Sequence, residues 1–135
     1  MGIRRCYILE ESVRELLEPQ GYRVDLMTPG RSRKPLPVNM LASRSPDERR
    51  YIRIKKMSGK PFDLSSVERF CKKEIPVYRR ILASRVNDRN LHFEIWIFVP
   101  SATFHCYEVL RDGVREIPAL SLKNQLHAPR AGGAA

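Results

Sequence analysis

Basic side chains gather in one segment of this 135-residue chain. The chain carries 25 Lys and Arg against 15 Asp and Glu, a formal net charge of +10. Residues 31–60 hold most of that excess, because this segment contains ten basic residues and only two acidic ones. Cations placed on phosphates release condensed counterions, so such clustering favours a polyanionic partner, most commonly nucleic acid. The basic residues concerned are Arg31, Arg33, Lys34, Arg44, Arg49, Arg50, Arg53, Lys55, Lys56 and Lys60.

The other residue types that could do chemistry form no recognisable site. Cys6, Cys71 and Cys106 are odd in number and widely spaced, which argues against a disulfide framework and against a zinc-type pair. We interpret them as small core residues of a reduced, cytoplasmic protein. The three histidines are scattered without ligand spacing. The sequence therefore predicts no cofactor.

The composition predicts one soluble domain. With 42% apolar residues, a chain of this length can build a single core. Its longest apolar run, residues 95–99, is far shorter than the roughly 20 residues needed to cross a bilayer, and the start of the chain lacks the apolar centre of a signal peptide. We expect no membrane partner.

The elements that must position the basic residues begin with a helix. An apolar stripe from Leu9 to Leu17 recurs at helical spacing, and the helix is expected to end at Glu18-Pro19. Alternating apolar residues predict a first strand at 22–26, and turn residues separate it from a second strand at 36–43. A third strand is predicted at 50–55.

A second helix is predicted in the middle of the chain. Ser65 and Glu68 have the spacing of a capping box, in which each side chain satisfies the other residue's backbone amide. Pro76 lies inside the same apolar pattern, so we expect a kink or break near residues 72–75.

The last elements are strands. Residues 93–99 are nearly all apolar, which predicts a central strand buried on both faces. Glu94 is the exception, and we expect an ion pair with a basic residue of the second helix. Residues 103–110 and 115–117 predict a hairpin around Asp112-Gly113.

Together these elements predict an α/β fold in a single domain. A central mixed β-sheet is flanked by helices, in the core order αβββαβ followed by a C-terminal β-hairpin. We place this domain at residues 1–118 and expect residues 119–135 to form an irregular tail.

This order resembles the core of the restriction-endonuclease-like superfamily, whose motif is PD-(D/E)xK and whose members include archaeal Holliday-junction resolvases. The resemblance covers about residues 6–100 and rests on element order, on LPVNMLA at 36–42 and on YIRIK at 51–55. In such nucleases the second strand presents an Asp and the third presents Glu-x-Lys. The resemblance implies that two carboxylates hold a divalent cation while the lysine stabilises the attacking water or the phosphate.

The sequence departs from that pattern at two positions. Asn39 stands at the Asp position and Arg53 at the Glu position, and only Lys55 keeps its type. A guanidinium where a metal ion should bind costs more Coulomb energy than one neighbouring carboxylate returns. We therefore expect no metal site, with Arg53 and Lys55 as phosphate clamps or as an ordinary solvent-facing strand edge. Tyr51, on the same face, is interpreted as a half-buried strand tyrosine, with base stacking as the alternative.

Carboxylates from other positions offer an alternative metal site. The resemblance implies a glutamate on the first helix, for which Glu10, Glu11 and Glu15 are candidates. Glu68, Asp25 and the turn residues Asp47-Glu48 are further candidates. Each also has an ordinary role on a polar helix face, in a helix cap, on a strand or in a solvated turn.

We therefore expect a nucleic-acid-binding protein with a degenerate, inactive nuclease-like site and no sequence specificity. The partner is the phosphate backbone of DNA or RNA. One alternative is a Mg²⁺-dependent nuclease that uses the relocated carboxylates. A second is a protein-interaction module that dimerises through the hairpin at residues 104–117. A third is a solvated basic face that only keeps the protein soluble.

Overall fold

A six-stranded mixed sheet forms the centre of the molecule, with its strands in the order β1-β2-β3-β4-β5-β6. The structure, a computed structural model, describes residues 2–27, 36–45, 47–58, 63–100 and 103–121, with side chains from residue 8 to residue 118 of that part. The predicted α/β class, mixed sheet and single domain are confirmed. None of the helices in these ranges is long and apolar enough to cross a bilayer. The elements are α1 (Gly2–Leu17), a 3-10 helix (Glu18–Gln20), β1 (Arg23–Leu26), β2 (Met40–Arg44), β3 (Glu48–Lys56), α2 (Leu64–Phe70), α3 (Ile75–Ser84), β4 (Leu91–Val99), β5 (Thr103–Val109) and β6 (Val114–Ser121).

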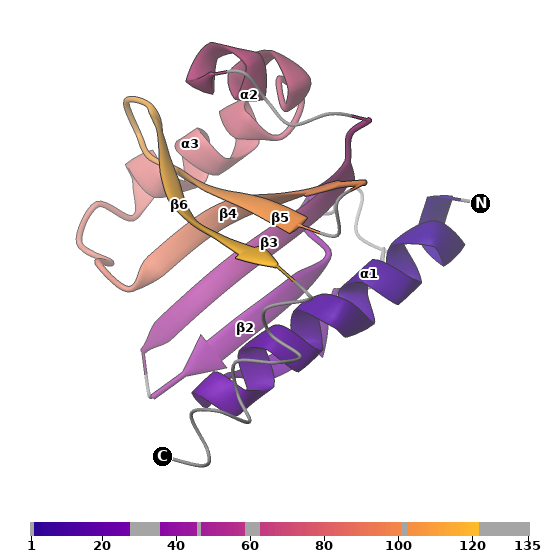
Figure 1. The fold of residues 1–135 in the computed structure, drawn as a ribbon. Helices are drawn as coiled ribbons and strands as arrows, with labels where there is room; N and C mark the ends of the chain where they lie inside the picture. Colours follow the sequence, from indigo (N-terminus) through magenta and orange to yellow (C-terminus); the bar gives the residue numbers. More distant parts are fainter. Residues whose placement is uncertain (1, 28–35, 46, 59–62, 101–102, 122–135) are drawn as a thin grey trace.

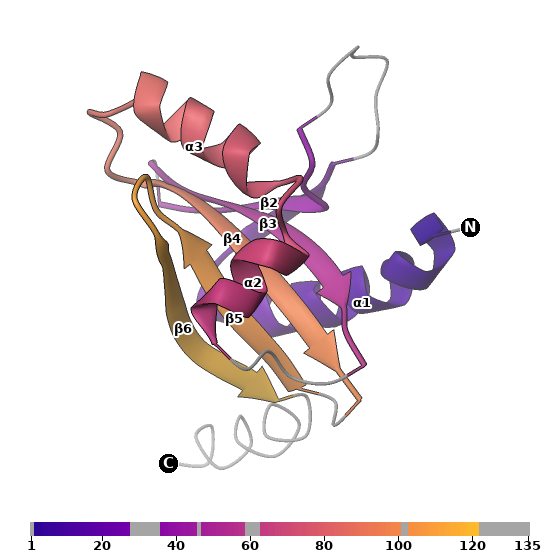
Figure 2. The same cartoon turned by 90° about the horizontal axis from the view of Figure 1, so that it is seen from above.

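The helices cover the two faces of the sheet. Helix α1 lies across one face, and α2 and α3 lie on the other (Figures 1 and 2). Strands β3 and β4 are parallel, and all other neighbouring strands are antiparallel. A parallel pair needs a crossover connection, which α2 and α3 supply. The two central strands are therefore buried between helix layers.

Strand β2 is shorter than its sequence predicts. It begins at Met40, because residues 36–39 form a turn in which the Val38 amide donates to the Leu36 carbonyl at 2.8 Å. Pro37 has no amide for a sheet ladder, and its carbonyl accepts a hydrogen bond from the Tyr78 hydroxyl of α3. The predicted start at residue 36 is therefore wrong, and this segment ties the sheet to α3.

The predicted break in the second helix is confirmed. Helix α2 ends at Phe70, and α3 begins at Ile75 with Pro76 in its first turn, where a missing amide costs no hydrogen bond. The predicted capping box is wrong. Asp63 caps α2, and its carboxylate accepts from the Ser66 amide at 2.8 Å. The short Asp side chain, placed two residues before the predicted cap Ser65, accepts directly from the free amide of Ser66.

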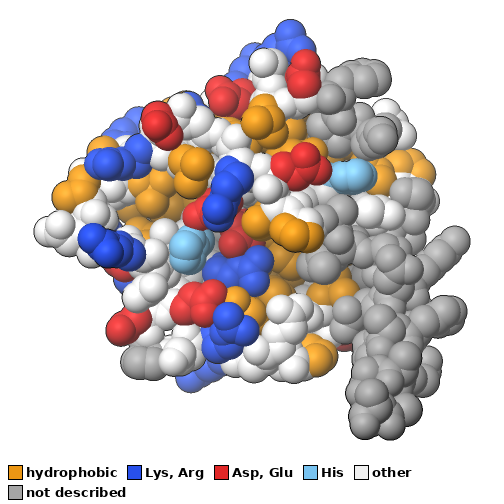
Figure 3. Space-filling model, turned by 60° about the vertical axis from the view of Figure 1, so that its left-hand side comes forward, with side chains coloured by type: hydrophobic (Ala, Val, Ile, Leu, Met, Phe, Trp, Pro, Cys, Tyr) orange, Lys and Arg blue, Asp and Glu red, His pale blue; other side chains and the backbone are white. Residues whose placement is uncertain are grey.

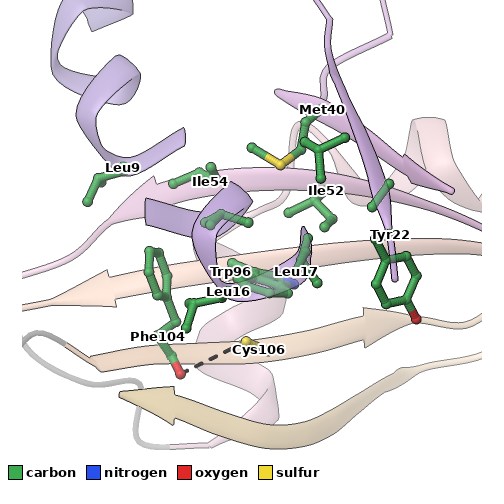
Figure 4. Packing of buried hydrophobic residues seen from close by; sticks show 13 residues of the cluster. Leu9, Leu16, Leu17, Tyr22, Met40, Ile52, Ile54, Trp96, Phe104 and Cys106 are labelled. Carbon is green, nitrogen blue, oxygen red and sulfur yellow. Dashed lines mark hydrogen bonds between the residues drawn. The ribbon is translucent and has the colours of Figure 1, made fainter. Parts of the chain in front are cut away.

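Two hydrophobic clusters hold the layers together. The cluster under α1 contains the predicted apolar stripe of that helix, packed on β2, β3, β4 and β5 (Figure 4). Trp96 and Phe104 meet edge to face at its centre, with ring centroids 5.6 Å apart. The second cluster lies under α2 and α3, where the rings of Tyr51 and Tyr78 stack on opposite sides of the Phe93 ring, with centroids 5.3 and 4.8 Å away. The prediction that Tyr51 is a half-buried strand residue is confirmed.

The described cysteines belong to these clusters. Cys71 and Cys106 are buried free thiols, as predicted. Burial raises the pKa of the Cys71 thiol to about 11 and raises that of Cys106 as well, because a thiolate is poorly solvated there. Both thiols are therefore protonated at neutral pH. The side chain of Cys6 lies outside the described residues.

The C-terminal hairpin is longer than predicted. The Leu110 amide donates to the Gly113 carbonyl at 2.8 Å, which confirms the tight turn. Strand β6 runs from Val114 to Ser121, so the predicted last strand at residues 115–117 is too short. The ladder shifts register beside Pro118, where an edge strand tolerates a residue without an amide.

Replacement of Ile52 by Ala tests the core under α1. Ile52 is 0% exposed, and its truncation should lower the free energy of unfolding by about 3 kcal/mol through lost burial and the cavity left behind. Ile8→Ala is the matched control, because that side chain is 70% exposed and its truncation should cost less than about 0.5 kcal/mol. Urea denaturation measures both values, and equal losses would contradict the packing described.

Candidate functional site

Alternation along β3 places the motif residues on two faces of the sheet. Ile52 and Ile54 enter the cluster under α1, whereas Tyr51 packs against the cluster under α2 and α3. Arg53 and Lys55 share the face of Tyr51, because side chains two residues apart point the same way. The predicted common face is confirmed, and the helix layer lies over it.

A buried glutamate meets both motif cations. Glu74, which is 4% exposed, immediately precedes α3. Its carboxylate lies 3.2 Å from Arg53 Nε and 3.1 Å from Lys55 Nζ. Lys55 Nζ also donates to the Phe70 carbonyl at 2.9 Å and lies 4.5 Å from the centroid of the Phe70 ring. We call Arg53, Glu74 and Lys55 the ion triad. Its lysine is held by protein groups on several sides.

Sequence reasoning missed Glu74 and favoured Glu68 as the carboxylate of the second helix. The side chain of Glu68 instead lies 3.5 Å from Arg79. Glu74 is the one acidic residue in the break between the two helices, next to Ile75-Pro76. The break was predicted from the sequence. The carboxylate of Glu74 within it could therefore have been identified as a candidate partner for basic residues elsewhere in the fold. Its partners on β3 could be identified only from the fold.

Asn39, which the resemblance matched to the nuclease Asp, bridges two elements. Its Oδ1 accepts from the Ile54 amide at 2.7 Å, and its Nδ2 donates to Glu10 of α1 at 2.9 Å. The side chain is buried. An aspartate could accept the first hydrogen bond but could not donate the second, and it would face Glu10 as a like charge. The amide therefore suits this position better than a carboxylate.

The other relocated-acid candidates lie apart from the motif. Glu11 is 3.4 Å from Arg14, and Asp25 is 3.4 Å from Arg23. Glu15 is exposed on α1. Of the candidates from the sequence, Glu10 alone is joined to a motif position by a hydrogen bond given for the described residues.

A shared metal site does not follow from this arrangement. Glu10 comes from the helix on one face of the sheet, whereas Glu74 comes from the layer on the other. Among the described residues, no three His, Cys, Asp or Glu side chains are grouped so that they could hold a metal ion. The carboxylates near the motif therefore act within this fold as partners of an amide and of two cations.

The basic residues of segment 31–60 that the structure describes are mostly paired. Arg44 Nε lies 3.1 Å from Glu48, and Arg49 is paired with Asp88. The other pairs are those of the ion triad and the Arg50 pair below, while Lys56 is exposed. Arg31, Arg33, Lys34 and Lys60 lie outside the described residues.

Arg50 is a half-buried structural residue. Its guanidinium makes two hydrogen bonds of 2.7 Å to the carboxylate of Glu94 on the neighbouring strand β4. Trp96 Nε1 donates to the same carboxylate at 3.0 Å. Burial opposes the charge of Arg50, but the bonds to Glu94 outweigh it and raise its pKa. The prediction that Glu94 pairs with a basic residue of the second helix is therefore wrong, because a strand neighbour is closer.

Polar residues continue from this pair across the sheet. On the α1 face, Arg50 and Glu94 each lie two residues before a core residue of their strand, and Glu108 lies two residues after Cys106 of β5. His92 Nδ1 is 2.7 Å from Glu108, which also binds Arg115. Figure 3 shows one side of the molecule, where basic and acidic side chains lie next to one another around a histidine. Each of these acidic side chains therefore lies close to a basic partner.

Glu74→Gln tests the ion triad. Removing this charge leaves Arg53 and Lys55 close together without a counter-ion, so the free energy of unfolding should fall by about 3 kcal/mol. Adding Lys55→Met should recover part of the loss, because one of the unpaired cations is then gone. Glu11→Gln, in a partly exposed pair on α1, should change stability by less than about 1 kcal/mol. Urea denaturation of the four proteins is the measurement, and a fully stable Glu74→Gln variant would contradict the assignment.

The pair of His92 and Glu108 predicts a pH dependence of stability. The hydrogen bond to Glu108 raises the pKa of His92, against the smaller opposing effect of burial. Burial alone would raise the pKa of Glu108, but hydrogen bonds from His92 and Arg115 outweigh it and lower that pKa. Because the folded-state pKa of His92 is raised, its contribution is complete below the ordinary value of 6.5 and is lost as pH rises through the raised value.

Unfolding free energies measured from about pH 5.5 to 8.5 check this expectation. The wild-type protein should lose stability toward the upper end of the range, and His92→Gln should show a flatter profile. Parallel profiles for the two proteins would contradict the pairing. The contribution of Glu108 to the free energy of unfolding has the opposite pH dependence to that of His92. It is lost when the pH falls through the lowered pKa of Glu108.

Comparisons of this chain with protein-family profiles, curated proteins and solved structures gave no match. The chemistry of the site is therefore interpreted from its own residues. These are a lysine and an arginine that share one buried glutamate, and an asparagine that links a helix to the sheet.

Proposed function

We propose that this protein binds the phosphate backbone of a nucleic acid and that its nuclease-like site does not cleave it. The single observation that supports the absence of cleavage is the ion triad. Arg53 stands where the third strand of a nuclease presents its metal-binding carboxylate, and the nearby Glu74 is already shared by two cations. A divalent cation would have to displace both charges to reach that carboxylate.

The arrangement of the elements supports the nuclease-like part of the proposal. A helix, a three-strand meander, a helical crossover and a parallel strand follow one another along the chain. If α2 and α3 count as one interrupted helix, this is the αβββαβ order, and the β5–β6 hairpin follows it. In this proposal the fold is an endonuclease-like domain whose motif positions have taken structural roles.

The distribution of charge supports the binding part. All 15 acidic residues lie between residues 8 and 118, where they nearly balance 17 basic side chains in the described ranges. The remaining basic residues of the chain fall in sequence segments that contain no acidic residue at all. A protein with this imbalance attracts polyanions, and phosphate diesters are the most abundant polyanionic ligands.

The described surface favours contact with the backbone over reading of bases. The exposed large hydrophobic residues among the described ones are Ile8, Leu64 and Val86, none of which is aromatic. Base stacking on a protein requires an accessible ring. We therefore expect binding that depends on charge and shape and that tolerates any sequence.

Fluorescence anisotropy with a labelled duplex DNA and a labelled single-stranded RNA tests this function. If about six phosphates are neutralised on the duplex, the logarithm of the association constant should fall against log salt with a slope of about −5. Two duplexes of different sequence should bind equally. If the protein binds neither the DNA nor the RNA at low salt, the proposal is rejected. Self-association of a protein that binds neither nucleic acid would favour a protein-interaction module.

The same substrates test for cleavage. Incubation with Mg²⁺ or Mn²⁺ should leave both nucleic acids intact, because the motif presents no free pair of carboxylates. Cleavage that disappears in chelator and in a Lys55→Ala variant would reject the inactive site and would favour a nuclease with relocated carboxylates. Cleavage that persists in the variant would indicate a contaminating enzyme, which repurification of the wild-type protein removes.

A further inference from the structure

The outer side of the helix layer carries basic residues that sequence clustering did not single out. They come from the turn after α2, from α3 and from the loop that leads to β4, and all are exposed. We call them the helix-layer surface. Its residues are Lys72, Lys73, Arg80, Arg85 and Arg89.

The carboxylates of the same stretch are already engaged elsewhere. Between residues 72 and 89 the only acidic residues are Glu74 and Asp88. Glu74 points to Arg53 and Lys55 of β3, and Asp88 is paired with Arg49 of the same strand. Both negative charges are therefore neutralised toward the sheet, and the outward-facing cations of this layer remain as excess charge.

A hollow continues this surface at the end of α3. Its volume is about 600 Å³, and its lining includes Arg85, Arg89 and Arg111. Arg79 donates to the Leu110 carbonyl at 3.0 Å, which holds the β5–β6 turn against α3. Arg85 and Arg89, which follow α3, and Arg111, from the β5–β6 turn, therefore line the same hollow.

Two of the three acidic residues in the lining are occupied, since Asp88 pairs with Arg49 and Glu108 binds His92 and Arg115. Asp112, in the exposed turn beside Arg111, is the remaining carboxylate of the lining. The three arginines therefore outnumber the acidic groups that are available to them. An anionic group entering the hollow meets a net positive charge.

We propose that the helix-layer surface and this hollow are where the phosphate backbone of duplex nucleic acid docks. The inference rests on the proposed function and deepens it, because it moves the contact from the strands to the outside of α3. That helix has 10 residues and is therefore about 15 Å long, which matches about four base-pair steps along one strand. Arg80 lies on this helix, with Lys73 shortly before it and Arg85 directly after it, so cations at and between its ends can reach different phosphates.

A lipid surface fits this face less well. Basic helices that bind membranes insert an apolar side between the headgroups. In α3 the apolar residues Ile75 and Tyr78 are buried against the sheet, so they are not available for insertion. Val86 is a single exposed hydrophobic residue beside the arginines and does not make an apolar face.

The test compares two double variants that remove the same charge from different places. Lys73→Gln with Arg80→Gln alters the helix-layer surface. Arg14→Gln with Arg23→Gln alters α1 and the far edge strand, where both arginines face carboxylates. Circular dichroism and thermal unfolding verify that each variant is folded. Binding to a duplex of about 20 base pairs is then measured by anisotropy over a series of salt concentrations.

The helix-layer variant should bind roughly tenfold more weakly, and its salt dependence should be less steep by about 2 in slope, because each lost phosphate contact removes about 0.9. The control variant should stay within about twofold of wild type and keep its slope. Equal weakening in both variants would overturn the inference, because net charge alone would then explain binding. A wild-type protein that binds no duplex would instead reject the proposed function itself.

Vesicles containing phosphatidylserine provide the last arm of the experiment. The wild-type protein should bind them more weakly than the duplex at the same salt concentration. Tighter binding to vesicles, lost in the helix-layer variant, would overturn the inference and assign this surface to a membrane.

Discussion

Positive charge within the central sheet is the constraint on which the rest of this structure depends. Four of the five basic side chains of strand β3 lie in or beside the sheet, and a cation in such a place is costly unless a carboxylate is close to it. The partners are Glu74, Asp88 and Glu94, which all come from later segments of the chain. These pairs therefore fasten the crossover and β4 to β3, in addition to the apolar contacts between the layers.

The same pairing determines where charge is available to a ligand. Glu74 and Asp88, the carboxylates of the segment from residue 72 to residue 89, pair with cations of β3. The exposed side of the layer formed by α2 and α3 is therefore left with fewer negative charges. Most cations of β3, which are conspicuous in the sequence, are paired within the fold, whereas the less clustered cations of the helix-layer surface are exposed. A positive surface thus arises on helices whose own sequence is only moderately basic, because their acidic residues serve the neighbouring strand.

The proposed likeness to a nuclease motif can be compared with the contacts that Asn39, Arg53 and Lys55 make in the structure. Asn39 occupies a position at which an amide can both accept from a strand and donate to Glu10, and a carboxylate cannot do both. Arg53 and Lys55 both contact the carboxylate of Glu74. Asn39 and Arg53, which depart from the nuclease pattern in the proposed correspondence, therefore each have a partner that a carboxylate at the same position would not have.

The sequence by itself determined the α/β class, the amphipathic first helix, the buried central strand, the break before Pro76 and the hairpin at Asp112-Gly113. These features depend on periodicity and on turn chemistry within a few residues, so local sequence is sufficient. Only the tertiary structure decided that Glu74 serves Lys55 and that Arg50 serves Glu94. Such choices depend on which side chains from distant segments come within about 3 Å of one another, because a charged hydrogen bond is short and directional.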